Sequence, residues 1–457
     1  MKKALRLDEI DAALDKFQPV TPDHEFYVNF ENVRGDFQEI EVMRILNAER
    51  KNGHYVYNAQ ANRNNKTFLF LAGMRGSGKT SELARYAQIL NSSECFFVVT
   101  CNIDEELDMD NVQYMDILIF QLEKLLRRAA DVKLKLDDDI LESMRKWFQD
   151  RVMEINRSLT ASGGLEIETG INQDEHPFSV GGILGKLLGI TAKLKAELGG
   201  SYERAENVRE TFRRRFGDFS TKFNAFIEQT NDQLRREKKA QEVLFIVDGL
   251  EKTMSAETRR RIIMEESNRL RQIRANTLFT LPIELMKERQ RIRQFAEIVS
   301  FPFVKLYERD GKEVEIAVKR FEDLVEKRID KSLFDSPETV HLAIKYSGGS
   351  PRQLLRILER ASWLRTDEQT QITHTNVQAA IEKVGNDYVQ YLEPAEWAAL
   401  RQLKTDLDKG NPIGFDETMQ GLLEKEIVFE YNDGTFKRVN PLVEVSKLYR
   451  HHVSDQL

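Results

Sequence analysis

The stretch Gly73-Met-Arg-Gly-Ser-Gly-Lys-Thr80 follows directly after the apolar run Thr67-Phe-Leu-Phe-Leu-Ala72, and it decides the fold of this chain. Its spacing of glycine, lysine and threonine is typical of a loop whose backbone N–H groups surround a phosphate. Lys79 would reach the β- and γ-phosphates of a nucleotide, and the Thr80 hydroxyl would bind Mg²⁺. The sequence therefore predicts a strand followed by a phosphate-binding loop.

The residues after this loop predict a helix, as the motif requires. Between Ser81 and Leu90, apolar side chains recur on one helical face. A bound anion would lie at the N-terminus of this helix, where the helix dipole favours negative charge. We expect a nucleotide to contact Gly73, Met74, Arg75, Gly76, Ser77, Gly78, Lys79, Thr80 and Ser81.

Length and composition limit the class of protein. With 457 residues the chain is long for one hydrophobic core, so two or three domains are expected. A net charge of -7 argues against a protein held to nucleic acid by its overall charge, although a local basic face is compatible with it. Cys95 and Cys101 have no partners at metal-site spacing, and no segment reaches the roughly 20 apolar residues that span a bilayer. We expect a cytoplasmic protein with no membrane contact.

Further apolar runs predict the rest of a sheet. Strands are expected at 94–103, 241–248, 276–282 and about 296–303. Because strands alternate with helices, the predicted fold is α/β with a parallel, doubly wound sheet. We place the nucleotide-binding core at residues 66–305, after an N-terminal segment, 1–65, that carries helices near 5–17 and 39–51.

Three polar residues lie at the ends of predicted strands. Asp248 ends an apolar strand, at the edge where open α/β sheets bind ligands, and is placed to hold Mg²⁺. Glu251 is a candidate to orient or deprotonate an attacking water. Thr280 ends the next strand and is a candidate sensor of the γ-phosphate.

A stretch of about a hundred residues, 138–240, separates two of the strands and predicts an insertion. Two charged helical stretches, near 140–159 and 205–238, flank a middle at 160–200 that contains Gly and Ser. A solvated helical hairpin on the core and a protein-binding surface are both compatible with this pattern.

Many arginines lie near the last two strands, at positions 259–274 and 287–293. One of them could act in trans on a neighbouring subunit as an arginine finger. A solvated basic face is the simpler interpretation of any single one.

The part of the chain after residue 305 is predicted to be a helical lid, 306–384. It contains Gly348-Gly-Ser-Pro-Arg352, in which Pro351 suits the first position of a helix. Arg352 then lies in the first helical turn, where a cation is unfavourable unless it meets an anion such as a nucleotide phosphate.

The C-terminal residues, 385–457, predict helices near 395–407 and 417–424 and a hairpin with a turn at Asn432-Asp-Gly434. This order resembles a winged helix. The region holds eight Lys or Arg against thirteen Asp or Glu, which disfavours DNA as its partner. A protein contact or an autoinhibitory role is expected instead.

Together, the phosphate loop, Asp248-Gly-Leu-Glu251, Thr280 and Gly348-Gly-Ser-Pro-Arg352 resemble P-loop ATPases of the STAND and AAA+ assemblage. The Asp-Gly-Leu-Glu form is similar to the Mg²⁺ motif of NACHT and NB-ARC switch ATPases, and the Gly-Gly-Ser-Pro-Arg turn to their lid motif. The loop also resembles that of bacterial ATPases with a Gly-rich insertion like residues 162–200. The resemblance covers about residues 65–384.

The resemblance implies roles for these residues. Lys79, Thr80 and Asp248 would bind Mg²⁺ and ATP, and Glu251 would support hydrolysis. Thr280 would be the sensor, while Pro351 and Arg352 would contact the nucleotide from the lid. Typical AAA+ proteins have Glu directly after the Mg²⁺-binding Asp, whereas Gly249 stands here, which favours slow switching.

The function that follows is an ATP-hydrolysing switch that forms a homo-oligomer and controls a separate effector protein. Family analogy suggests bacterial antiphage defence. The alternative is a DNA-associated AAA+ ATPase, such as an initiator, a loader or a transposition regulator. A nucleotide-binding scaffold without hydrolysis is a third hypothesis.

Overall fold

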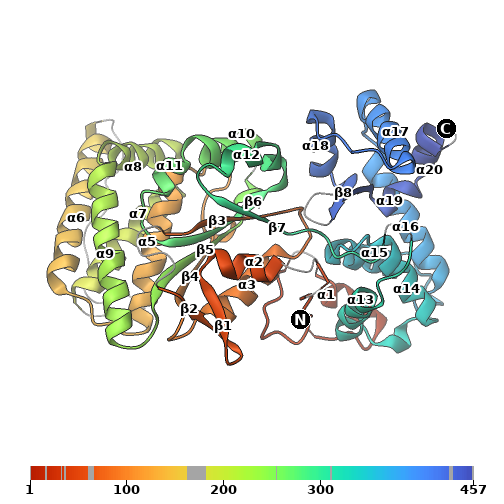
Figure 1. Cartoon of the computed structure of the whole chain (residues 1–457), viewed down its shortest axis with the longest axis horizontal. Coiled ribbons are helices and arrows are strands. Elements are labelled where there is room, and N and C mark those ends of the chain that lie inside the picture. The colour runs from red at the N-terminus through yellow and green to blue at the C-terminus, as the bar shows by residue number, and fades with distance from the viewer. Residues whose placement is uncertain are drawn as a thin grey trace.

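The computed structural model describes residues 2–15, 18–31, 33–34, 38–59, 66–161, 182–253, 255–308, 311–431 and 436–454. At its centre is a five-stranded parallel sheet with the strand order β4-β5-β6-β3-β7 (Figure 1). The strands are β3 (Phe68–Gly73), β4 (Phe96–Asn102), β5 (Glu242–Asp248), β6 (Asn276–Pro282) and β7 (Glu297–Ser300). The predicted α/β fold class, with a P-loop NTPase-like parallel sheet, is confirmed.

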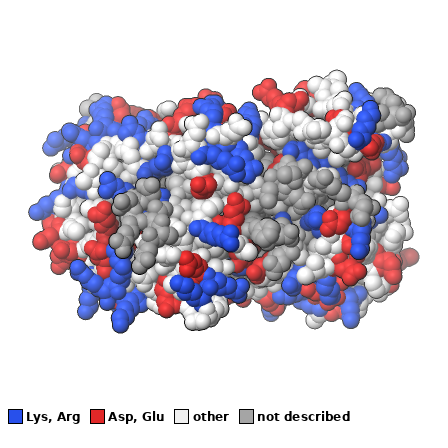
Figure 2. Space-filling view, viewed as in Figure 1, with Lys and Arg blue, Asp and Glu red and all other residues white. Residues whose placement is uncertain are grey.

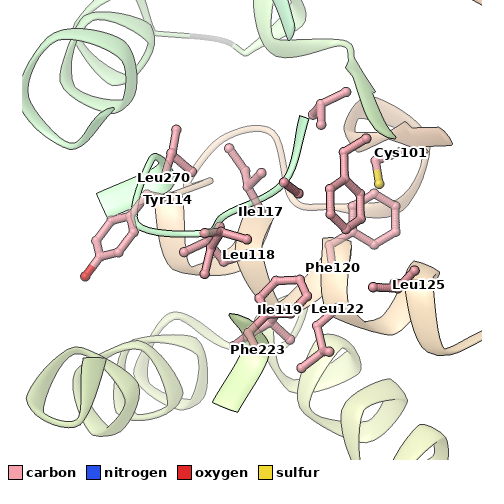
Figure 3. Packing of buried hydrophobic residues seen from close by; sticks show 14 of the residues in the cluster. Cys101, Tyr114, Ile117, Leu118, Ile119, Phe120, Leu122, Leu125, Phe223 and Leu270 are labelled. Carbon is pink, nitrogen blue, oxygen red and sulfur yellow. The ribbon is translucent and has the colours of Figure 1, made fainter. Parts of the chain in front are cut away.

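Helices cover both faces of this sheet because alternate residues of each strand point to opposite sides. Leu69 and Leu71 pack with α3 (Lys79–Leu90) on one face. Phe70 and Ala72 pack on the other face, in a cluster with α5 (Tyr114–Asp131). Figure 3 shows the α5 side chains of this cluster gathered with Phe223 and Leu270, which come from elements distant in sequence.

The insertion is a helical bundle rather than a simple hairpin. It contains α6 (Asp138–Ala161), α7 (Ile183–Leu198), α8 (Tyr202–Arg214) and α9 (Phe216–Arg236). The helix α7 lies in the stretch predicted as a Gly- and Ser-containing middle, 160–200, of which residues 162–181 lie outside the described residues. Bundle residues share one hydrophobic cluster with the sheet, with Phe223 of α9 against Phe245 of β5.

The N-terminal segment differs from the prediction. Within the described range 2–15, only η1 (Leu7–Glu9) and α1 (Ile10–Ala13) are helical, and the second helix, α2 (Gln38–Ile45), ends early. Asn47 has a φ of 56°, which ends the helix, and a hairpin of β1 (Ala48–Lys51) and β2 (His54–Tyr57) follows. Its turn is Asn52-Gly53, with φ of 50° and 87°, the local preference that overrode the helical pattern.

The chain between β5 and β7 is broken into short elements. They are η2 (Leu250–Lys252), α10 (Ala256–Arg260), η3 (Arg261–Glu265), α11 (Ser267–Leu270), η4 (Ile283–Glu288) and α12 (Arg289–Ile292). Residues 256–270 therefore do not form one continuous α-helix. A π-helical turn at η3 interrupts this stretch.

The second lobe in Figure 1 consists of the lid and the C-terminal module. The lid comprises α13 (Glu315–Arg328), η5 (Lys331–Leu333), α14 (Pro337–Tyr346), α15 (Pro351–Trp363) and α16 (His374–Val389). The C-terminal module comprises α17 (Pro394–Lys409), α18 (Glu417–Glu424), β8 (Val428–Tyr431), β9 (Phe436–Val439), α19 (Pro441–Glu444), α20 (Lys447–Tyr449) and η7 (Arg450–Ser454). β8 and β9 pair antiparallel, while the turn predicted at 432–434 lies outside the described residues.

The first residues of the chain pack on the lid rather than on the sheet. Ala4, Ile10 and Phe26 belong to the same buried cluster as Phe321 of α13 and Leu358 of α15. In the part of the chain that the structure describes, no helix has the length and apolar character needed to cross a membrane.

Candidate functional site

The phosphate loop connects the end of β3 to the start of α3. Gly76 and Gly78 have φ of 76° and 94°, in the left-handed region that favours glycine. Gly78 is the residue before the helix, and no side chain of the described residues caps the helix there. The N–H groups of the first turn of α3 are therefore free of a side-chain cap and can bind an anion.

Lys79 is the first residue of this helix, and its side chain folds back across the loop. Its Nζ donates to the carbonyl oxygens of Gly73, at 2.9 Å, and Met74, at 3.0 Å. The same nitrogen lies 3.5 Å from Oε1 of Glu251. Two loop carbonyls and one carboxylate thus hold the ammonium group inside the loop.

The strand order brings Asp248, Glu251 and Thr280 to the same edge of the sheet. β6 lies between β5 and β3, and Thr280 is paired in register with Leu71 of the loop strand. Asp248 ends β5, and Glu251 follows in η2. All three side chains are buried, so distant segments meet beside the phosphate loop.

The two carboxyl groups have opposite pKa shifts. Burial, and then the charge of Glu251, raises the pKa of Asp248 to about 6, against the opposing effects of Thr80, Lys79 and Lys252. Burial also works against ionisation of Glu251, but Lys79 and its other neighbours outweigh it and lower the pKa of Glu251. The arrangement keeps Glu251 ionised and leaves Asp248 short of positive charge.

Several buried oxygens at this edge lack partners. Among the described residues, Asp248 Oδ1, Glu251 Oε2, Thr280 Oγ1 and Ser77 Oγ have no partner at hydrogen-bond geometry, although the Thr280 hydroxyl is near enough to Glu251 to help lower the pKa of that carboxyl. Unsatisfied buried polar atoms are unfavourable, and they are expected where a ligand completes the site. Mg²⁺ prefers oxygen ligands, so Asp248 and the neighbouring Thr80 hydroxyl fit this ion.

The lid contacts the phosphate loop directly. Ser350 Oγ donates to the carbonyl oxygen of Gly76 at 3.3 Å, and it also accepts from Gln353 N as the cap of α15. Pro351 is the first residue of that helix. Arg352 lies against Gly76, where an added Cβ would be 3.0 Å from the Cβ of the arginine. The structure therefore brings the two predicted lid residues to the loop.

A cavity of about 460 Å³ lies between the loop, the lid and the N-terminal segment. Val20 of that segment donates its N–H to Ser81 Oγ at 3.3 Å. Phe26, Tyr27 and Phe30 also line the cavity. Sequence reasoning missed this wall, although the aromatic-rich run Phe26-Tyr-Val-Asn-Phe30 was a signal that could have suggested it.

Two buried arginines at this cavity were also missed. Arg34 donates to the carbonyl oxygen of Pro302 at 3.0 Å and lies over the Phe301 ring, with 4.3 Å to its centroid. Arg328 donates to backbone carbonyls of Phe26 and Leu324. Burial lowers the pKa of each guanidinium to about 10, and neither pairs with a carboxylate of the described residues.

Charge around the cavity favours an anionic ligand. The basic residues that line it outnumber the acidic ones: Arg34, Arg75, Lys79, Lys252, Arg328 and Arg352 against Asp15, Glu82 and Glu251. A nucleoside triphosphate carries several negative charges, and a concave site of excess positive charge attracts such a ligand.

The C-terminal module reaches the loop from a third direction. The Met74 side chain lies in a buried cluster with Trp397, Leu423 and Phe429. Tyr431 Oη donates to the carbonyl oxygen of Gly348 at 2.7 Å, next to the start of α15. One loop is therefore in contact with the N-terminal segment, the lid and the C-terminal module.

No protein-family model matches the sequence, and no curated protein matches it either. Among solved structures, a Walker-type ATPase of Pyrococcus abyssi is similar, with 13% sequence identity and a TM-score of 0.37. The match covers 92% of this chain and 98% of that chain. Because the sequence identity and the TM-score are both low, the chemistry of the site must be derived from this chain's own residues, which form a P-loop NTPase-like core.

Proposed function

We propose that this chain is an ATP-driven switch that binds ATP and Mg²⁺ at the phosphate loop and hydrolyses ATP slowly to ADP and phosphate. The observation that carries the proposal is that one loop is in contact with three other parts of the chain. A phosphate that enters the loop changes the surroundings of Arg352 and Met74 together. Nucleotide state can therefore bias the position of the lid and the C-terminal module.

Each residue has a role that its position supports. Lys79 and the N–H groups of α3 bind the phosphates, and Thr80 and Asp248 hold Mg²⁺, which when bound neutralises phosphate charge. Glu251, which is ionised and buried, orients the attacking water. Thr280 senses the γ-phosphate through its unpaired hydroxyl.

Gly249 explains why the acidic residue stands three positions after Asp248. Gly249 has a φ of 100°, and a Cβ on it would lie 2.3 Å from Asp104 Oδ1. A glutamate directly after Asp248 therefore does not fit this turn. Glu251 reaches the loop from the next turn, where its ion pair with Lys79 must rearrange during turnover, which favours a slow cycle.

Hydrolysis is tested with three variants of the full chain. Lys79→Ala is expected to lose ATP binding, whereas Glu251→Gln should bind ATP and fail to hydrolyse it. Glu265→Gln is the control, because Glu265 is an exposed carboxylate on η3 and should leave turnover unchanged. Equal turnover in Glu251→Gln and wild type would contradict the proposed site.

Switching is tested by small-angle X-ray scattering of Glu251→Gln with ATP and wild type with ADP. A switch predicts two different radii of gyration. Identical scattering, together with normal ATP binding, would leave an ATPase without the proposed domain movement.

We also propose a cellular role for the ATP-bound form. We expect the ATP-bound form to assemble into a homo-oligomer, with a trans-acting arginine, and to control a separate effector in antiphage defence. The supports are the resemblance to NACHT and NB-ARC ATPases and an acidic, winged-helix-like C-terminal module suited to protein contact. Sedimentation with and without ATP tests assembly, and plaque counts with wild type and Lys79→Ala test defence.

A further inference from the structure

The exposed residues of α11, α12 and their flanks are unusual in composition. Between Ser267 and Ala296, all of the exposed side chains are cationic or carry an amide: Asn268, Arg269, Arg271, Gln272, Arg274, Lys287, Gln290, Arg291, Arg293 and Gln294. The two acidic residues of this stretch are not exposed. Glu284 is buried with Arg259, and Glu288 is half-buried beside Arg260. A protein of net charge -7 thus has a local surface of the opposite sign.

These cations form one surface, which we call the basic face: Arg269, Arg271, Arg274, Lys287, Arg291 and Arg293. Its two halves are adjacent because the Arg271 guanidinium lies over the Phe295 ring, at 5.8 Å from the centroid. Figure 1 places α10, α11 and α12 along one side of the ATPase core, and Figure 2 shows Lys and Arg gathered over α12.

Few carboxylates neutralise the basic face. Arg291 pairs with Glu288 at 3.1 Å, and Arg274 makes a long contact of 3.9 Å with exposed Glu228. Within the described ranges, the other four cations have no carboxylate partner, and Arg269 lies over the Phe216 ring. Their charge is available to an external anion.

We infer that the basic face binds the sugar–phosphate backbone of a nucleic acid. Arg and Lys neutralise phosphates, and Asn and Gln side chains donate hydrogen bonds to phosphate and sugar oxygens. None of the large apolar side chains found exposed in the described residues lies on the basic face, so it lacks the anchors typical of a protein interface.

This surface is separate from the proposed ATP site. None of the six residues lines the nucleotide cavity, and the inference does not depend on ATP hydrolysis. The acidic C-terminal module is not required for it either. Nucleic-acid binding on the core and a protein-contact role for the C-terminal module are compatible.

The test compares two triple variants of the full chain that change net charge equally. Arg269→Gln, Arg271→Gln and Arg293→Gln remove three cations of the basic face that have no carboxylate partner. Arg214→Gln, Arg235→Gln and Lys319→Gln remove three exposed cations of α8, α9 and α13, and each of these cations has a carboxylate partner on its own helix. Fluorescence anisotropy measures binding of a labelled DNA duplex, a single strand and an RNA of the same sequence at several salt concentrations.

We expect wild type and the control to bind at least one of these probes, and the basic-face variant to bind it about tenfold or more weakly at low salt. The slope of log affinity against log salt should fall by about 0.9 for each lost phosphate contact to a duplex. Equal affinities and slopes in both variants, or no binding by wild type, would overturn the inference. A changed oligomeric state in sedimentation with unchanged nucleic-acid binding would instead identify the face as a subunit contact, and would also overturn it.

Discussion

Asp116 in α5 and Asp248 at the end of β5 are both buried aspartates, but their surroundings differ. They are 2% and 3% exposed. Both oxygens of Asp116 accept hydrogen bonds, from Arg209 Nε at 2.9 Å, Arg209 Nη2 at 2.7 Å and Gln113 N at 3.0 Å. Asp248 Oδ1 has no partner among the described residues.

Hydrogen bonding, rather than the pKa shift, distinguishes a buried carboxylate at a site from one that stabilises the fold. Burial raises the pKa of both groups, against Arg209 in the case of Asp116 and with the help of Glu251 in the case of Asp248. The pKa shift alone does not separate them. The hydrogen bonds do, because both oxygens of Asp116 are paired within the fold, whereas Asp248 has an unpaired oxygen beside the phosphate loop that is available to a ligand.

The largest effect is expected from Asp116→Asn, which removes the charge of the aspartate whose oxygens are both hydrogen-bonded. Arg209 would remain buried with only the longer 3.7 Å contact to Glu206, and breaking a buried pair costs about 3–5 kcal/mol. Chemical denaturation should show this loss of stability, and ATP affinity should be unchanged where the protein is still folded.

Adding Arg209→Met to Asp116→Asn should recover part of the lost stability, since no unpaired charge then remains buried. A single variant as stable as wild type would mean that the pair contributes nothing to the fold.

Asp248→Asn should have the next largest effect, and it changes the aspartate that has an unpaired oxygen. The amide keeps the shape but loses the charge that would hold Mg²⁺, so turnover should fall by about 10²-fold or more. Stability without nucleotide should be unchanged or higher, because an underpaired charge is removed. A thermal shift assay and a phosphate-release assay measure the two outcomes. A variant that is strongly destabilised yet active would reverse the roles of the two aspartates.

Local patterns explain what the sequence could predict. The strands are short apolar runs, and Asp248 and Thr280 were predicted as site residues because Asp248 ends one such run and Thr280 lies near the end of the next. Pro351 and Arg352 were found because proline marks the first turn of a helix. Each of these signals lies within a few neighbouring residues.

The rest depends on contacts between distant segments. Arg34 and Tyr27 reach the cavity only because the N-terminal segment packs on the lid, which no local pattern shows. The bundle helix α7 was not predicted because glycines have a low helix propensity. It forms because its packing against α5 and α6 outweighs that propensity. The basic face emerges only when Glu284 is seen to be buried with Arg259.

Thr280→Val is a smaller change, which removes one hydroxyl group near Asp248. Thr280 is fully buried with an unpaired hydroxyl, so valine should leave the stability of the nucleotide-free protein within about 1 kcal/mol. One hydrogen bond lost in the reacting complex lowers turnover by about tenfold. Denaturation and single-turnover assays measure these two values. A large loss of stability with full activity would show that the hydroxyl has a structural partner.

Thr191→Val is the matched control in the insertion and has the smallest expected effect. Thr191 is also fully buried, but its hydroxyl is close to the carbonyl oxygens of Leu187, at 3.2 Å, and Leu188, at 3.0 Å. Losing that bond should cost about 0.5–1 kcal/mol of stability with unchanged turnover. The two threonine variants therefore differ only in which property they change. Because both remove one buried hydroxyl, any effect of Thr191→Val on turnover would mean that the bundle is coupled to the site, and that hydrogen-bond satisfaction does not separate structural groups from functional ones.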